Sequence, residues 1–426
     1  MPFFSPLVHP VNEKLHLPLM RNMLMHARIM VLPVSCGNFL KTVKHLNGTY
    51  IFPNLTTLVI ATNSVSRTFS LLALLPPTLK ELILLLADGH HGLPFFRALR
   101  VSQSRLCKLQ IDSSNSPGTP VINDPLAIPP GIRFYAAQNC ILHPSLLRTL
   151  MFEPKLEALE ICANPLDNDL TIDFPPTTFI FQSLTSLSVT TTTDHQSHQV
   201  FRILQQPHLR TQLTEFKVSI KIEPGSETIL GAAQELNNYA KLKSLQIVIN
   251  PDGQDLPFVD FDLEVTIGDL IKRGTLTTLV LRNLLLEHSA WAFLARYAKR
   301  LVHLSVTADD IRPEEARFFS IEYTEFVDVV NGCRALTDFA VFLRTPFTSP
   351  ANIPDLTHLE HRTTRFTFHP HPGGFFYSNV KFAGAFLAKY FPTMTIFPPD
   401  HRLAHALRDA LEEAASDPFS PHFAPE

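Results

Sequence analysis

The chain has 426 residues, of which 45% are hydrophobic, and a formal net charge of -3. This length exceeds what a single hydrophobic core usually holds, so it predicts either two or three globular domains or one extended repeat array. The apolar fraction excludes general disorder, and the balanced charge excludes the strongly basic field that nucleic acid or anionic lipid attracts.

The cysteines and the amino-terminal residues indicate the compartment. The five cysteines are odd in number and contain no Cys-x-x-Cys pair, which is typical of buried thiols in a reducing compartment. Prolines interrupt residues 1–20 before any sustained apolar run, which argues against a secretory signal, and the apolar run at 71–87 is too short to span a bilayer. We therefore expect a cytoplasmic or nuclear protein that is not secreted and does not bind a membrane.

The first fifty residues are the least regular part of the sequence. The pattern Ala27-x-x-Met30-x-Leu32 indicates a degenerate opening strand, and residues 39–46 a short helix. A repeat array needs its first open core face closed, so we expect residues 1–50 to form an N-terminal helical cap or a degenerate first repeat.

Residues 51–345 repeat the pattern Leu-x-x-Leu-x-(Leu/Ile/Val), most visibly in the copies Leu55-Thr-Thr-Leu58 and Leu276-Thr-Thr-Leu279. Predicted strands start at Leu55, Leu79, Leu106, Ile132, Leu156, Leu184, Leu213, Leu242, Leu276, Leu301 and Leu336. Their mean spacing of about 28 residues leaves room for a helix in each repeat. Alternation along a strand turns the leucines toward the core, so we expect the threonines of both copies to point outward and the leucines, not the threonines, to hold the fold together.

Proline, asparagine and cysteine at recurring positions support this placement of the predicted strands. Proline often stands two residues before a strand start, where it imposes an extended backbone. Asparagine or cysteine often stands three residues after the last strand leucine, where its side chain can bond the backbone of the turn; these residues are Asn63, Cys140, Asn164 and Asn250.

Helical patterns separate the predicted strands. They cover residues 66–75, 93–102, 145–152, 196–205, 226–239, 262–272, 289–299 and 313–331. Ser226, Asp262 and Ser289 are predicted N-caps. The alternation predicts an α/β solenoid of about 11 repeats, a curved horseshoe with a parallel β-sheet on the concave face and helices on the convex face.

After Val341 the pattern fades. We expect residues 346–415 to form a degenerate repeat and a C-terminal cap, and residues 416–426 a disordered tail. The next strand is left open between Leu356-x-x-Leu359 and residues 365–368, and a last helix is predicted over 401–415.

Candidate chemistry is sparse. No phosphate-binding, hydrolase or metalloprotease motif occurs. His401 and His405 lie four residues apart on a predicted helix and could hold zinc, but no glutamate of the metalloprotease motif and no third ligand is evident. The other close pairs fall in polar, turn-like segments and indicate exposed loop histidines; they are His195 and His198, His358 and His361, and His369 and His371. We therefore expect no catalytic site, no metal and no cofactor.

The outward strand positions are the candidate binding surface, because they tile the concave face of a repeat array. Acidic and basic residues are balanced there among serines and threonines, which suits a protein partner better than a polyanion. The candidate partner-binding residues are Lys80, Glu81, Lys108, Gln110, Arg133, Phe134, Glu157, Glu160, Glu215, Lys217, Lys243, His303 and Asp338.

Two strand motifs carry a family resemblance: Tyr239-Ala-Lys-Leu-Lys-Ser-Leu-Gln-Ile and Tyr297-Ala-Lys-Arg-Leu-Val-His-Leu-Ser-Val. With them, residues 50–400 resemble leucine-rich-repeat proteins of the ribonuclease-inhibitor-like class, and among these the divergent fungal F-box/leucine-rich-repeat proteins. Such relatives imply substrate recognition for a cullin-type ubiquitin ligase, with F-box helices that dock a Skp-type adaptor. No Leu-Pro-x-Glu-like F-box opening precedes the repeats here. We therefore expect a non-enzymatic protein–protein interaction scaffold, with the F-box-like subunit as the alternative.

Overall fold

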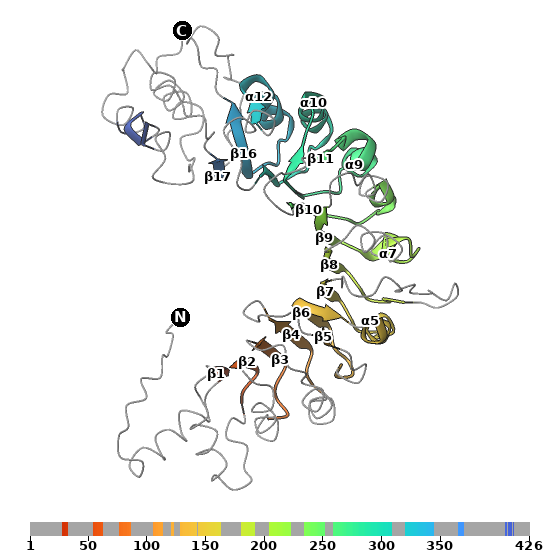
Figure 1. The fold of residues 1–426 in the computed structure, drawn as a ribbon. Coiled ribbons are helices and arrows are strands. Elements are labelled where there is room, and N and C mark those ends of the chain that lie inside the picture. Colours follow the sequence, from red (N-terminus) through yellow and green to blue (C-terminus); the bar gives the residue numbers. More distant parts are fainter. Residues whose placement is uncertain are drawn as a thin grey trace. The chain divides into compact units, whose positions relative to one another are not determined.

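A computed structural model describes residues 28–32, 54–62, 76–86, 105–113, 121–122, 128–142, 144–162, 180–191, 204–222, 234–251, 259–308, 320–344, 365–369, 405–406, 408–410 and 412. The chain divides into two compact units, residues 1–184 (unit 1) and residues 185–426 (unit 2). Figure 1 shows the helices and strands of each unit. The cap expected at 1–50 is described only at 28–32, and the tail expected at 416–426 lies outside the described residues.

Unit 1 is built on a parallel sheet. Its elements are β1 (Ile29–Leu32), β2 (Thr57–Thr62), β3 (Glu81–Leu86), β4 (Lys108–Asp112), β5 (Val121–Ile122), β6 (Phe134–Leu142), α5 (Pro144–Met151) and β7 (Ala158–Cys162). Strands β1, β2, β3, β4, β6 and β7 pair in chain order, each parallel to the next, and β5 pairs the end of β6. The degenerate opening strand expected around Met30 is confirmed as β1.

Unit 2 repeats this plan. Its elements are β8 (Ser186–Thr191), α7 (Leu209–Gln212), β9 (Glu215–Ile222), η2 (Glu235–Asn238), β10 (Ser244–Pro251), β11 (Val259–Asp260), α9 (Leu263–Lys272), β12 (Thr278–Arg282), β13 (Leu284–Leu285), α10 (His288–Tyr297), β14 (His303–Thr307), β15 (Ser320–Glu322), α12 (Tyr323–Gly332), β16 (Asp338–Arg344) and β17 (Arg365–His369). Strands β8, β9, β10, β12, β14 and β16 pair parallel in chain order, and β16 also pairs β15 and β17. Helices α9, α10 and α12 follow one another along the same side of this sheet (Figure 1).

The leucine pattern predicted the strands correctly. All eleven expected start residues are buried, and a strand begins two residues after each of them. The α/β class and the parallel, solenoid-like order of strands are therefore confirmed within each unit, whereas the curvature and the number of repeats stay predictions.

Backbone hydrogen bonds explain why each strand begins two residues after its start residue. At the entry to β3, the amides of Lys80 and Glu81 both donate to the carbonyl of Thr56, at 2.8 and 3.0 Å. At most strand entries of both units, two consecutive amides share one carbonyl of the preceding strand entry in the same way. Each start leucine therefore points into the core just before the regular hydrogen-bond ladder of the sheet begins.

The first threonine of each copy of the repeated motif makes a hydrogen bond that adds to the fold, although the buried leucines form its core. The Oγ1 of Thr56 donates to the Arg28 carbonyl at 3.1 Å, and that of Thr277 donates to the Lys243 carbonyl at 3.1 Å. Thr214 and Thr337 make the same bond to the preceding strand entry. A threonine hydroxyl at this position therefore ties four of the strand entries to the ones before them.

The helix predictions over 145–152, 262–272 and 289–299 are confirmed, whereas the others are described only in part, need correction or lie outside the described residues. The helix expected over 196–205 is described only at 204–205, and α7 at Leu209–Gln212 was not predicted. Within 226–239 the described helix is the short 3-10 helix η2. Helices α5, α9 and α10 lie within about a residue of the predicted ranges, and Asp262 caps α9 by accepting from the Val265 amide at 3.0 Å. Ser289 is not the N-cap of α10, because the helix begins at His288 and its N-cap is Glu287. Of the helices predicted at 66–75 and 93–102 nothing is described, and Ser226 also lies outside the described residues.

The helix predicted over 313–331 is wrong at its start. Residues 320–322 form β15, which pairs Phe342–Arg344 of β16, and α12 begins only at Tyr323. Glu322 caps it in a capping box with Glu325. The long interval before Leu336 therefore holds a strand and a helix.

Beyond β16, the structure decides between the two strands left open. Residues 365–369 form β17, parallel to β16 with Asp338 opposite Arg365, whereas Leu356-x-x-Leu359 lies outside the described residues.

Candidate functional site

In each sheet one face is buried and the other is partly exposed. Strands β4, β7 and β8 alternate strictly between half-buried and buried residues. The buried residues are the leucines, isoleucines and valines of the repeat, and the half-buried ones are their polar neighbours. We call the half-buried side of each unit its sheet face.

Charged and aromatic side chains meet on the sheet face of unit 1. Glu81 and Lys108 are direct register partners on β3 and β4, and the Lys108 ammonium lies 5.0 Å from the centroid of the Phe134 ring. On the next strands, Gln138 Nε2 donates to Glu160 Oε1 at 2.9 Å. The four adjacent strands β3, β4, β6 and β7 therefore present an acidic, a basic, an aromatic and an acidic side chain in turn.

Four of the candidate partner-binding residues lie at the edge of a sheet face and not on it, three in unit 1 and one in unit 2. Lys80, Arg133, Glu157 and Lys243 each precede a strand by one residue, so they sit at the edge where the strands begin. The guanidinium of Arg133 donates to Glu157 Oε1 from Nε at 2.8 Å and from Nη2 at 2.5 Å, while both side chains remain about half exposed. This hydrogen bond, with the charge of Glu157, raises the pKa of Arg133. The sequence could not distinguish edge positions from face positions, because the pattern predicts that side chains at both point away from the core.

The sheet face of unit 2 carries fewer charges. His303 and Asp338 are register partners on β14 and β16, and His303 Nδ1 lies 2.9 Å from Asp338 Oδ2. Glu215 and Lys217 face the same way on β9, opposite Ser244 and Gln246 of β10. The thirteen candidates therefore form two sets, eight residues in unit 1 and five in unit 2.

Two asparagines, Asn283 and Asn250, join neighbouring strands of unit 2, and Asn283 was not predicted. Asn283 is buried with a φ of 61°, its amide N donates to the Thr307 carbonyl at 2.8 Å, and its side chain donates to the Ile249 carbonyl at 2.6 Å. It therefore joins β12 to both neighbouring strands. Asn250, at the predicted asparagine position, instead donates to Ser219 Oγ at 2.6 Å on β9. Asparagine is favoured at a left-handed backbone position, which explains its presence at 283, but no signal in the sequence identified this position.

The described thiols are poorly suited to nucleophilic chemistry. Burial raises the pKa of Cys333 to about 12 and also raises the pKa of Cys162, which disfavours the reactive thiolate. The Cys107 thiol donates to the Lys80 carbonyl at 3.3 Å.

Within the described part of the chain, no three His, Cys, Asp or Glu side chains gather as metal ligands. His405 is exposed, and its expected zinc partner His401 lies outside that part, as do the paired histidines at 195, 198, 358, 361 and 371.

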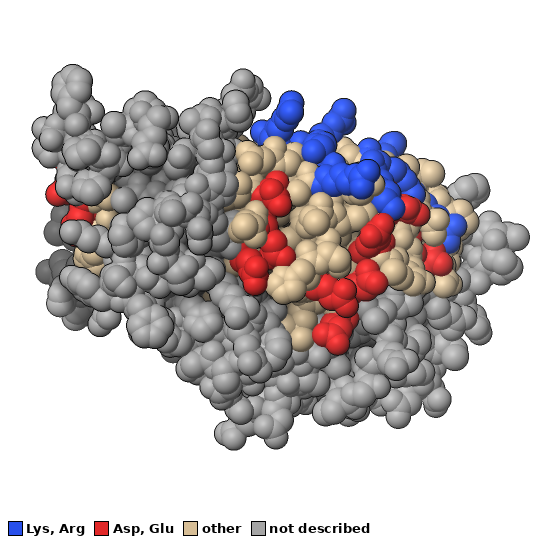
Figure 2. Space-filling view, turned by 90° about the horizontal axis from the view of Figure 1, so that it is seen from above, with Lys and Arg blue, Asp and Glu red and all other residues tan. Residues whose placement is uncertain are grey.

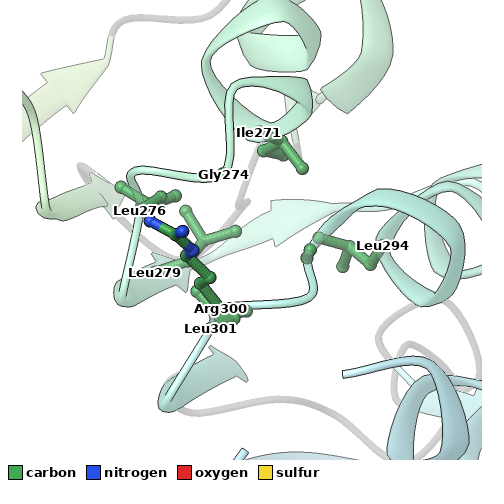
Figure 3. Close-up of a pocket in the computed structure, with 8 residues that line it drawn as sticks. Ile271, Gly274, Leu276, Leu279, Leu294, Arg300 and Leu301 are labelled. Carbon is green, nitrogen blue, oxygen red and sulfur yellow. The ribbon is translucent and has the colours of Figure 1, made fainter. Parts of the chain in front are cut away.

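One small pocket opens in unit 2 where α9 and α10 end against β12. It encloses about 220 Å³ of space that includes open solvent, and its lining is apolar except for Arg300. Figure 3 shows Leu279 of β12 and Leu294 of α10 on opposite sides of it and the Arg300 guanidinium beside Leu276 and Leu279. A shallow gap with one cation and no acidic or nucleophilic side chain resembles a packing defect more than a substrate site.

Comparisons with known proteins find no family model that matches the chain and no curated protein with significant similarity to it. Among the described helices, none is both long and apolar enough to cross a membrane.

Proposed function

We propose that the chain is a leucine-rich-repeat scaffold without enzymatic activity, and that it binds a protein partner through its sheet faces. The observation that carries this proposal is a parallel sheet with one partly exposed polar face. Parallel sheets are usually covered by helices on both faces and are then apolar on both. Strands that alternate between buried leucines and half-buried polar residues are suited to a face that meets solvent or a partner.

The chemistry of this face favours a folded protein over a polyanion. Glu81, Lys108 and Phe134 offer both signs of charge and an aromatic ring within three adjacent strands. Aromatic residues supply much of the binding energy in protein interfaces, and charges of both signs provide orientation and specificity. A polyanion would instead be repelled by Glu81 and Glu160.

Pull-down of partners from a cell extract tests this proposal. The test variant reverses the charges of Lys80, Glu81, Lys108 and Arg133, and the control reverses Arg148, which is exposed on α5. We expect the test variant to lose partners that the wild-type and control proteins retain. An unchanged set of partners, from a variant whose circular dichroism matches the wild type, would contradict the assignment of the sheet face.

The same pull-down also tests the alternative function, an F-box-like subunit of a ubiquitin ligase. Its adaptor-binding helices would precede residue 51, where the structure describes only residues 28–32. Recovery of a Skp-type adaptor with both the wild-type chain and the sheet-face variant would favour that alternative, because the adaptor would not need the sheet face.

A further inference from the structure

Basic residues cluster where the strands of unit 2 begin. Each lies within four residues of a buried leucine that opens β9, β10, β12, β14 or β16. They are Arg210, Lys241, Lys243, Lys272, Arg273, Lys299, Arg300 and Arg334. Because these strands are parallel and in register, the entry turns line up along one edge of the sheet. We call this set the basic ridge.

Acidic residues gather at the opposite ends of the helices in unit 2. Asp262 and Glu264 open α9, Glu287 opens α10, and Glu322 and Glu325 open α12. A helix of ten residues is about 15 Å long, so the two ends of each helix are separated by about that distance, although Glu264 and Lys272 of α9 still meet at 3.4 Å. Figure 2 shows Lys and Arg gathered along one rim of the surface and Asp and Glu in a separate band. The small net charge of the chain therefore conceals a strong local separation.

Half of the ridge has structural partners. Arg210, Lys272, Arg273 and Lys299 each bond another part of the repeat. Their acceptors are, in that order, the carboxylates of Glu235 and Glu264 and the carbonyls of Asn237 and Ala295. Basic groups at helix ends also offset the helix dipole, so these four residues are explained by the fold.

The other half of the ridge has no such explanation. Lys241, Lys243, Arg300 and Arg334 are exposed, and among the described residues no side-chain bond joins any of these four cations to a carboxylate or a carbonyl. They occupy the entries to β10, β14 and β16. Arg300 is also the cation that lies over the apolar pocket (Figure 3).

We propose that Lys241, Lys243, Arg300 and Arg334 bind an extended, acidic segment of a protein partner. From β10 to β16 the sheet advances by three strand spacings, or about 14 Å. An extended peptide covers that distance in four to five residues, at about 3.3 Å per residue. A short run of Asp and Glu can therefore place a carboxylate near each cation.

The dimensions of the ridge favour a peptide over nucleic acid. A duplex is much wider than an extended peptide, so on the ridge its phosphate backbone would also lie near the Glu264 carboxylate, which contacts Lys272. Single strands usually bind where bases can stack on aromatic rings. The described entry turns at 240–243, 298–302 and 332–337 contain no aromatic residue.

The test measures binding of a fluorescent twelve-residue glutamate peptide to the full chain by anisotropy. The ridge variant replaces Lys241, Lys243, Arg300 and Arg334 with glutamine. The control variant replaces four exposed basic residues elsewhere with glutamine, namely Arg105, Arg148, Lys155 and Arg408, and so changes the net charge equally. Circular dichroism and thermal unfolding verify that both variants fold.

We expect the ridge variant to bind the peptide at least about tenfold more weakly than the control, and salt to weaken binding to the wild type. Equal affinity of the two variants, or no binding by the wild type, would overturn the proposal. Tighter binding of a duplex or single-stranded oligonucleotide than of the peptide at the same salt would overturn it in favour of nucleic acid. Lys243 belongs both to the ridge and to the sheet-edge candidates, but the sheet-face variant changes only residues of unit 1, so each proposal can fail without the other.

Discussion

At the scale of single residues, Asn237 joins η2 to a kinked helix. Its Nδ2 donates to the Thr266 carbonyl and its Oδ1 accepts from the Leu270 amide, each at 3.1 Å. Thr266 and Leu270 are the pair that would bond each other in a regular helix, and Ile267 between them has non-helical angles. The asparagine amide therefore satisfies the backbone groups that the kink in α9 frees.

We predict that Asn237→Ala lowers the free energy of unfolding by about 1–2 kcal/mol, because two partly buried backbone groups lose their partner. The neighbouring Asn238→Ala is the matched control, since its exposed side chain bonds only Glu235 in the described structure. Its effect should stay within about 0.5 kcal/mol. Urea unfolding followed by circular dichroism measures both, and equal values would show that the amide does not support the kink.

Individual residues such as Asn237 and Asn283 were beyond sequence reasoning. Their partners lie about thirty residues away in the chain, at Thr266 and at Ile249. Such a bond depends on how one repeat stacks on the next. The predicted asparagine position identified Asn250 but assigned it to a turn, whereas its side chain crosses to the neighbouring strand.

At the scale of elements, α10 and α12 pack with almost no space between them. A Cβ at Gly332, the last residue of α12, would lie 2.0 Å from the Ala295 carbonyl oxygen of α10. Phe326 of α12 also stacks on Phe339 of β16 with ring centroids 5.6 Å apart. The position of α12 is therefore fixed by backbone contact on one side and by aromatic packing on the other.

We predict that Gly332→Ala lowers the free energy of unfolding by about 3 kcal/mol or more, because the helices must separate to admit a methyl group. Gly274→Ala is the control: Gly274 has a φ of 67°, but a Cβ there would meet nothing within 4 Å. Its cost should be about 1–2 kcal/mol from the left-handed backbone alone. A smaller loss for Gly332→Ala than for Gly274→Ala in urea unfolding would contradict the packing described.

Elements were predictable where the sequence repeats. The start leucines located eleven strands because burying one leucine in every repeat requires the same phase throughout. The short strands β5, β11, β13 and β15 were missed, because two or three residues carry no period and pair only where a neighbour is available. Residues 320–322 are an example. Their sequence pattern is typical of a helix, yet they form a strand that pairs with the end of β16.

At the scale of the whole molecule, the surface was the least predictable feature. The composition shows only a net charge of -3. The separation of basic from acidic residues became visible only in the structure, where the helices of unit 2 are oriented alike. The signal was nevertheless present, since lysine and arginine stand directly before the strand leucines at Lys241, Arg300 and Lys155. The outward positions likewise needed coordinates before Lys80 and Arg133 could be placed at the edge and Glu81 and Lys108 on the face.

Position-resolved photo-crosslinking tests the central claim, that the sheet faces bind a protein partner. A benzophenone side chain replaces Gln110 on β4 or Lys217 on β9, and in the controls replaces Arg148 on α5 or Asp328 on α12. We predict that irradiation in a cell extract joins a polypeptide to the chain from positions 110 or 217 and not from positions 148 and 328. Crosslinks from the helix positions alone, or equally from all four, would contradict the claim.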